Sequence, residues 1–341
     1  MNSQQSGTSG FPKQNQKHKE RCSSDSVENS HFSRQNGLRS LKGLNIVIAG
    51  LGLMGGALAD AFRQLEPHSL IAYDQNEEVL EQALSDGVID EGFSDERIAP
   101  ALSRADLVCV CLYPRLTADF ICHYMPVFKP GVVITDIAGI KKPVIEAVSQ
   151  TLREDVDYIP GHPMAGSEKE GYGGADRRIF VDRNYILVPL QSNSTASLDF
   201  LKRLIRKIGF TNIVETTAEN HDSKIAFTSE LCHVIASALI DGEDDLQITD
   251  YEGGSFADLT RIAMINASMW SQIFCENKEA LVEKIDGFMN SMNNLRDLIN
   301  DENTEELEQV LAAVRKKRIK MEIDRINKHS KTEQQEQEEQ E

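Results

Sequence analysis

Two segments of the sequence combine residue types and spacings that support chemistry. The first is the run Gly50–Gly55 (GLGLMG), which directly follows an apolar, strand-like stretch and opens a helical one. In that context the first glycine permits a tight turn, the second lets the backbone approach a pyrophosphate, and the third allows the helix to pack closely on the strand. The start of the helix offers N–H groups and a positive dipole end to the phosphates. We therefore expect a dinucleotide at this turn.

Asp74 ends the next strand-like stretch, at the distance from the glycine run where a ribose-binding carboxylate is expected. A carboxylate here accepts hydrogen bonds from the adenosine ribose hydroxyls and repels the additional phosphate of NADP. Gln75 and Asn76 follow, so no arginine stands there to bind that phosphate. We predict NAD as the cofactor, and the residues assigned to it are Gly50, Leu51, Gly52, Leu53, Met54, Gly55 and Asp74.

The second segment, GHPMAGSEKEGY at residues 161–172, holds a histidine between a glycine and a proline. It follows a predicted strand around Tyr158–Ile159, so we expect His162 on a constrained loop at the carboxyl end of a strand, where doubly wound folds bind ligands. A histidine that only stabilises its loop by hydrogen bonding fits the same pattern.

Two polar clusters follow in the last third of the chain. Asp222, Ser229 and His233 are spaced so that a regular helix would carry all three on one face. Such a stripe suits a binding site, and it equally suits a face turned to solvent. The run GGSFADLTRIA then brings Asp258 and Arg261, which also fit an ordinary ion pair between neighbouring turns of a helix.

The elements that must position these residues follow from the hydrophobic pattern. Short apolar runs alternate with helical segments as far as about residue 217, which indicates a parallel sheet covered on both faces. After Ala218 only helical periodicity is found, up to about residue 326. We predict an α/β fold, a doubly wound Rossmann-type parallel sheet followed by an all-helical C-terminal domain. The predicted boundaries are a disordered tail at 1–42, an NAD-binding domain at 43–217, a helical substrate and dimerisation domain at 218–326, and a disordered acidic tail at 327–341.

Composition limits the classes of function. The 341 residues include 36 Lys and Arg against 54 Asp and Glu, a net charge of −18. This acidity argues against a nucleic-acid partner and against docking on anionic lipid, and we expect no membrane association. None of the six cysteines forms a C-x-x-C pair, and four lie in apolar stretches. That pattern indicates reduced thiols and a cytoplasmic protein, with no metal site expected.

Five motifs together resemble one known family. GLGLMGGALA, DIAGIKK, GHPMAGSEKEGY, HDSKIAFTSELCH and GGSFADLTRIA with a following MW occur in the order found in the prephenate dehydrogenase family of tyrosine biosynthesis. The resemblance runs from about Leu44 to about Asn277. It implies NAD-dependent oxidative decarboxylation of prephenate to 4-hydroxyphenylpyruvate, or of arogenate to tyrosine, and a homodimer formed through the helical domain.

The resemblance also implies roles for single residues. It places the catalytic general base on His162 and the arginine that binds the ring carboxylate of the substrate on Arg261. The other substrate-pocket positions fall on His233, Ser229, Glu168 and Gly139. At the last of these the family commonly carries a serine, so a backbone N–H or a water must act here in place of its hydroxyl.

The sequence departs from the family at a second place, and two other classes of protein also fit it. The run Glu230-Leu231-Cys232 precedes His233 where many members of the family carry His and Pro. Glu230 either brings a negative charge to the anion site, which would favour the amino substrate arogenate, or points away. A β-hydroxyacid dehydrogenase is a second interpretation, and it would need Lys224 as its catalytic lysine. A non-catalytic NAD-binding sensor is a third.

Overall fold

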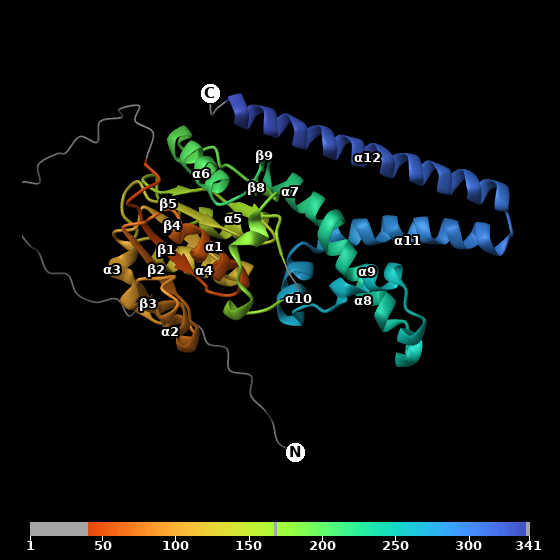
Figure 1. Cartoon of the computed structure of the whole chain (residues 1–341), viewed down its shortest axis with the longest axis horizontal. Coiled ribbons are helices and arrows are strands. Elements are labelled where there is room, and N and C mark those ends of the chain that lie inside the picture. Colours follow the sequence, from red (N-terminus) through yellow and green to blue (C-terminus); the bar gives the residue numbers. More distant parts are fainter. Residues whose placement is uncertain (1–39, 167–168, 339–341) are drawn as a thin grey trace, which may run out of the picture. The chain divides into compact units, whose positions relative to one another are not determined.

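The computed structural model describes residues 40–166 and 169–338 of the chain (Figure 1). Six strands form one sheet in the order β3-β2-β1-β4-β5-β6, and every adjacent pair is parallel. Their bounds are β1 Asn45–Ala49, β2 Ser69–Tyr73, β3 Glu91–Phe93, β4 Leu107–Val110, β5 Val133–Asp136 and β6 Asp157–Tyr158. The strand order reverses between β1 and β4, which is where doubly wound sheets bind their ligands. The predicted fold class is confirmed.

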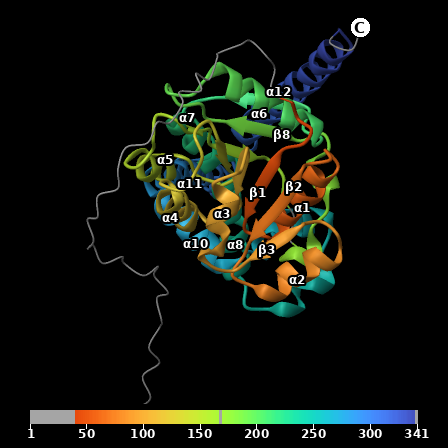
Figure 2. The same ribbon diagram turned by 90° about the vertical axis from the view of Figure 1, so that its left-hand side faces the viewer.

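Helices cover both faces of this sheet (Figure 2). Alternate residues of β1 point to opposite sides, with Ile46 and Ile48 in one buried cluster and Val47 and Ala49 in the other. The first cluster includes residues of α1, α2 and α6, and the second includes residues of α3, α4 and α5. The bounds are α1 Leu53–Arg63, α2 Glu77–Ser85, α3 Ala99–Leu102, α4 Pro114–Tyr124, α5 Lys142–Ser149 and α6 Thr195–Lys207.

The apolar runs Tyr185–Val188 and Asn212–Glu215 are part of the alternating pattern that predicts the parallel sheet, but the structure places them in a second, three-stranded sheet. Its order is β7-β8-β9, with an antiparallel and a parallel pairing, and its strands are β7 Gly161–Pro163, β8 Asn184–Leu187 and β9 Asn212–Glu215. His162 therefore lies in a short strand and not on the predicted loop. The hydrophobic pattern identified β8 and β9 as strands, but partner choice depends on long-range packing that the pattern does not encode.

The described residues after β9 are all helical or irregular, as predicted. Helices α11 and α12 form an antiparallel pair (Figure 1). Helix α12 continues to Glu338, so the backbone from residue 327 to 338 is helical where we expected a disordered tail. The helices are α7 Ala218–Ile225, α8 Leu231–Asp241, α9 Gly254–Thr260, α10 Ala267–Glu276, α11 Lys278–Asn300 and α12 Thr304–Glu338. Short turns are η1 Glu96–Ile98, η2 Tyr172–Gly174, η3 Arg177–Phe180, η4 Ala226–Glu230, η5 Leu246–Tyr251 and η6 Arg261–Ala263.

One helical stretch of the described chain, Ala218–Asp241, has the length and mean hydropathy, 1.2, of a membrane-spanning helix, and 28% of its most apolar window is buried. The same stretch carries buried Asp222 and Glu230, both hydrogen-bonded to other elements of the fold. Charged groups satisfied by neighbouring protein elements are typical of a helix inside a folded domain.

Candidate functional site

The glycine turn between β1 and α1 has the geometry that a dinucleotide requires. Gly50 has φ +95°, and a β-carbon there would lie 2.5 Å from the carbonyl oxygen of Cys111. A β-carbon on Gly55 would lie against the carbonyl oxygen of Gly50, so any side chain there would push α1 off the strand. Around Gly52, the residue that precedes α1, no heavy atom lies within 4 Å of an added β-carbon. That open space at a helix start without a side-chain cap fits a pyrophosphate.

Asp74 follows β2 at the same carboxyl edge of the sheet and is half-buried. Its carboxylate accepts the Leu51 N–H at 2.7 Å and the Asn76 N–H at 2.9 Å. These bonds hold the carboxylate beside the glycine turn and leave acceptor capacity for ribose hydroxyls. The residues present therefore fit an adenine dinucleotide.

His162 is bonded to a buried histidine that the sequence did not single out. Its Nδ1 lies 2.9 Å from Nε2 of His221 on α7, and Nδ1 of His221 lies 2.6 Å from Oδ1 of Asp222. His221 and Asp222 are buried, whereas His162 is half-buried. Strand β7 also contacts β5, so His162 lies close to the parallel sheet. The first helix of the helical domain thus reaches the predicted base.

Asp222 is bonded to the start of α5 as well. Its two carboxylate oxygens accept the backbone N–H groups of Lys141 at 2.8 Å and Lys142 at 2.9 Å. The dipole of a helix N-terminus stabilises a negative charge at this place. The Lys141 side chain is fully buried and forms an ion pair with Asp136 at the end of β5, and Asp136 also accepts the Tyr158 hydroxyl at 2.8 Å. Every charge in this buried cluster has a partner.

The imidazoles of the cluster are held neutral. Burial lowers the pKa of His162 well below its usual value, and the nearby His221 and Lys141 lower it further. Burial also lowers the pKa of His221, although its hydrogen bond to Asp222 acts in the opposite direction. A neutral imidazole is the form that accepts a proton, so the environment of His162 suits a general base.

The remaining predicted substrate residues lie in the helical domain. His233 on α8 bonds through Nδ1 to the carbonyl oxygen of Ser229 at 2.9 Å, and its ring stacks on Trp270 with centroids 3.7 Å apart. Arg261 is exposed on η6, which packs against α8. The structure therefore gathers Ser229, His233 and Arg261 in one region of the helical domain. Among the described residues, His162 bonds to His221 whereas His233 bonds to Ser229, so the two histidines share no hydrogen-bond partner.

The prediction of one helix face for Asp222, Ser229 and His233 is wrong. The helix is interrupted between them by η4, a π-helical segment over Ala226–Glu230. A π-bulge changes the residue spacing per turn, so the positions after it rotate relative to those before it. Asp222 consequently points to the start of α5, while His233 packs on Trp270.

Two further predicted positions have different outcomes. Gly139 lies half-buried between β5 and α5, and a β-carbon there would meet only Ile273 Cδ1, at an ordinary 3.7 Å. The site therefore has room for the serine side chain that this chain lacks. Glu168 lies outside the described residues. Lys224, which the β-hydroxyacid interpretation requires, is exposed.

Glu230 does not present its charge to the region of His233. Its side chain is fully buried, and both carboxylate oxygens accept the Asn277 amide, at 2.9 and 3.1 Å. The same amide donates to the carbonyl oxygen of Asp222 at 3.0 Å. Burial raises the pKa of Glu230 to about 7; the Asn277 hydrogen bond lowers it and the charge of Asp222 raises it. Of the two possibilities left open, the structure therefore supports a Glu230 that points away.

Replacing Glu230 by Gln is expected to stabilise the protein at pH 8 and to have little effect at pH 5. The folded state holds the Glu230 proton up to about pH 7, whereas the ordinary pKa is 4.5, so stability from this group falls as pH rises between these values. The full effect is about 3 kcal/mol. Thermal unfolding at both pH values measures it, with Glu283→Gln on exposed α11 as the control. Equal Tm shifts at both pH values would contradict the prediction.

His221 escaped prediction because the residues around it follow an ordinary amphipathic helix pattern. The available signal was the adjacent pair His221-Asp222 directly after a capped helix start, where Thr217 accepts the Asn220 N–H. Asp136 and Lys141 carried a further signal, since one ends a strand and the other precedes a helix. They form an ion pair with each other, and their further partners Tyr158 and Asp222 became visible only in the fold.

Comparison with known proteins agrees with this geometry. Residues 58–214 match the family model for the prephenate dehydrogenase nucleotide-binding domain, and residues 217–313 match the model for the prephenate dehydrogenase dimerization domain. A cyclohexadienyl dehydrogenase of Zymomonas mobilis is 32% identical over 256 residues, covering 72% of this chain and 85% of that protein. A prephenate dehydrogenase of Bacillus subtilis is 28% identical, covering 72% of this chain and 68% of that protein.

Solved structures show the same likeness. The crystal structure of prephenate dehydrogenase from Aquifex aeolicus, in complex with hydroxyphenyl propionate and NAD⁺, superposes with a TM-score of 0.74 at 29% identity and covers 81% of this chain and 97% of that one. Arogenate dehydrogenase from Synechocystis gives 0.69 at 26% identity, with 82% and 99% covered. By sequence, by domain order and by fold, this chain belongs to the prephenate dehydrogenase family.

Proposed function

We propose that this protein catalyses the NAD-dependent oxidative decarboxylation of prephenate to 4-hydroxyphenylpyruvate in tyrosine biosynthesis. The observation that carries the proposal is His162, a neutral imidazole anchored through Nδ1, in a chain whose two domains both match the prephenate dehydrogenase family. Arogenate, the amino form of the same ring, is the alternative substrate. Glu230 gives no support to it, because that carboxylate is buried against Asn277.

One residue removes a proton from the substrate, and the others bind and orient it. His162 removes the proton from the C4 hydroxyl of the ring, and a carbonyl forms at C4 as the hydride leaves. Loss of the ring carboxylate as CO₂ then makes the ring aromatic, and the C4 oxygen takes back the proton from His162. NAD, when bound, supplies the acceptor for that hydride. Arg261 binds the ring carboxylate, since a guanidinium holds a carboxylate with two parallel hydrogen bonds. His233 and Ser229 complete the pocket from the helical domain, and most of the rate enhancement comes from orientation and one general base.

An absorbance assay with the two candidate substrates tests the proposal. The full-length protein with NAD is expected to form NADH on addition of prephenate and to show a lower kcat/KM with arogenate. A protein that forms no NADH with either compound would contradict the proposal and would favour the sensor interpretation. A higher kcat/KM for arogenate would assign the alternative substrate.

The cofactor preference follows from Asp74. The 2′-phosphate of NADP would lie against a half-buried carboxylate that is already held by two backbone N–H groups. Because like charges placed together cost several kcal/mol, we expect kcat/KM to be roughly 100-fold higher with NAD than with NADP. Steady-state kinetics with both cofactors measure this ratio. Equal values would mean that Asp74 does not face the ribose.

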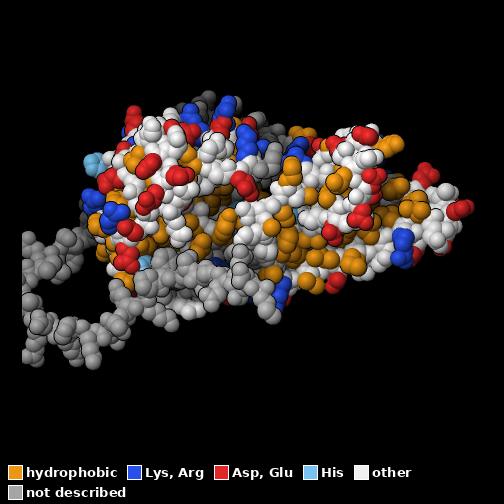
Figure 3. All heavy atoms as spheres, turned by 90° about the horizontal axis from the view of Figure 1, so that it is seen from below, with side chains coloured by type: hydrophobic (Ala, Val, Ile, Leu, Met, Phe, Trp, Pro, Cys, Tyr) orange, Lys and Arg blue, Asp and Glu red, His pale blue; other side chains and the backbone are white. Residues whose placement is uncertain are grey.

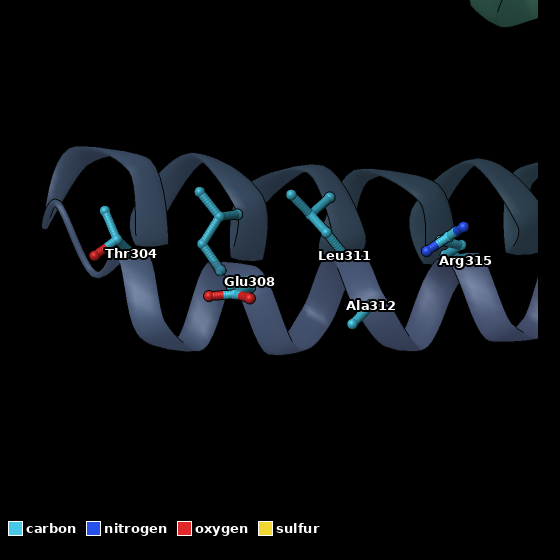
Figure 4. Close-up of a pocket in the computed structure, with 6 residues that line it drawn as sticks. Thr304, Glu308, Leu311, Ala312 and Arg315 are labelled. Atoms are coloured by element: carbon cyan, nitrogen blue, oxygen red, sulfur yellow. The ribbon is translucent and has the colours of Figure 1, made fainter.

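The proposal includes a homodimer formed through the helical domain. Figure 3 shows hydrophobic side chains gathered over this part of the molecule on the face drawn. Helix α12 presents a shallow, open surface on successive turns, where Leu311 and Ala312 lie among the polar side chains of Thr304, Glu308 and Arg315 (Figure 4). Exposed apolar surface of this extent favours association. The exposed apolar residues of the helical domain include Leu246, Tyr251, Leu259, Met264, Ile299, Leu311 and Val314.

Sedimentation at micromolar concentration is expected to show a dimer. The double substitution Leu311→Glu with Val314→Glu puts two charges on exposed apolar positions of α12 and should weaken the dimer at least tenfold, because burying an unpaired charge is costly. Lys317→Glu on the same exposed helix changes the net charge by the same amount and serves as the control. A wild-type monomer, or equal weakening by both changes, would overturn this part of the proposal.

We place the protein in the cytoplasm on the state of its thiols. The described cysteines are all free, and Cys109 and Cys111 keep their sulfur atoms 3.8 Å apart without a bond. Unpaired thiols this close together are typical of a reducing compartment.

A further inference from the structure

We infer that His221 and Asp222 are positioning residues that fix the tautomer of His162, so that its Nε2 carries the lone pair that accepts the substrate proton. The inference rests on the proposed function for the role of His162 as the base. It concerns side chains of two different domains, since His162 lies on β7 and the other two on α7. The carboxylate of Asp222 determines which atom donates in its bond to His221, and this in turn determines which atom donates in the bond between His221 and His162.

Asp222 determines the direction of the first bond. An ionised carboxylate only accepts hydrogen bonds, and its Oδ1 lies 2.6 Å from Nδ1 of His221. The two backbone N–H groups at the start of α5 donate to the same carboxylate and, with the helix dipole, favour its ionised form. Nδ1 of His221 must therefore carry the hydrogen of this bond.

The tautomer of His221 determines which atom donates in its hydrogen bond to His162. In a neutral imidazole with its hydrogen on Nδ1, Nε2 is an acceptor. Nε2 of His221 lies 2.9 Å from Nδ1 of His162, so Nδ1 of His162 must be the donor. A neutral His162 with its hydrogen on Nδ1 has a bare Nε2. This is the nitrogen on the far side of the ring from His221, and it is the one available to a substrate.

Burial keeps both rings neutral, although Asp222 and Asp136 act in the opposite direction on His221. The charged groups facing the pair are Asp222, the buried Lys141 ammonium and its partner Asp136. Burial disfavours the imidazolium form of each ring, and Lys141 adds to the effect. Only 1% of His221 and 5% of Asp222 is exposed, so water does not replace either hydrogen bond.

Two variants of nearly equal size separate positioning from mere structural support. In His221→Gln the amide nitrogen can donate to Asp222 and the amide oxygen can accept from His162, as the neutral imidazole does. In His221→Met both functions are lost while a similar volume is filled. We expect His221→Met to lower kcat roughly 10- to 100-fold, a part of the 10²–10⁴ that a general base contributes, and His221→Gln to stay within about threefold of wild type. KM should change less than about twofold in both, because His221 is buried and bonds to His162 through its own Nε2.

Nitrogen-15 NMR of labelled histidine provides a readout that does not depend on activity. Wild type and His221→Gln are expected to show His162, assigned by its loss in His162→Asn, with hydrogen on Nδ1 and a bare Nε2. In His221→Met the hydrogen should appear on Nε2. Equal kcat in the Gln and Met variants, or a wild-type His162 with its hydrogen on Nε2, would overturn the inference. If wild type has the expected tautomer but oxidises neither prephenate nor arogenate, the proposed function fails and the assignment of the hydrogen bonds stands.

Discussion

His162→Asn is expected to lower kcat by roughly 10²–10⁴, the range that a positioned general base contributes, while KM changes little. Asparagine keeps a polar side chain in β7 that can still bond to His221, but it cannot accept a proton at neutral pH. The wild-type enzyme should lose activity only as pH falls through the lowered pKa of His162, because the imidazole stays neutral above it. Initial rates over a range of prephenate concentration and pH measure both effects.

A second histidine provides the control for this experiment. His68 is exposed just before β2, at the amino edge of the parallel sheet, and His68→Asn should leave kcat and KM unchanged. Thermal unfolding of His162→Asn shows whether the variant is folded. Near-normal turnover in a folded His162→Asn protein would mean that another group removes the hydroxyl proton.

Arg261→Ala is expected to raise KM for prephenate by about 10- to 100-fold with a smaller change in kcat. Charge-assisted hydrogen bonds to a carboxylate are worth about 1.5–3 kcal/mol, and this contribution is present in both the bound substrate and the transition state. Arg261→Lys should recover part of the loss, because an ammonium keeps the charge but not the paired geometry. Steady-state kinetics measure the separation between KM and kcat.

Arg296 is the matched control for Arg261. It is also an exposed arginine of the helical domain, on α11, where it bonds to Asp297. Arg296→Ala removes the same charge from the protein and should leave KM unchanged. If Arg261→Ala and Arg296→Ala gave the same KM, the carboxylate of the substrate would have to be bound elsewhere.

Local pattern predicted the elements that depend on near neighbours in the chain. Helix α2, Glu77–Ser85, and strand β1, Asn45–Ala49, belong to the predicted alternation of apolar runs and helical segments. Their signals are local: a capping Asn76 whose side chain accepts the Glu78 N–H, and a continuous apolar run ended by Gly50. The glycine turn belongs to the same class, because its conformation depends on which of its residues lack a side chain.

Local pattern did not predict the contacts around His162. The sequence singled out His162, yet its partner His221 is 59 residues away and the contact of Asp222 with Lys141 spans 81 residues. The π-bulge over Ala226–Glu230 also turned Asp222 away from the face that regular helical spacing assigned to it. Neither a long-range bond nor a local change of helical register has a periodic signal in the sequence.

The sequence predicts the doubly wound fold, the helical second domain, the dinucleotide turn and the likeness to the prephenate dehydrogenase family. Each of these depends on hydrophobic period, glycine positions or short motifs, which neighbouring residues carry together. Only the tertiary structure decided that His162 lies in a second sheet, that Glu230 is buried against Asn277, and that Asp222 meets the start of α5. The physical reason is that burial and hydrogen bonding of a polar side chain are set by the elements packed around it, and those come from distant parts of the chain.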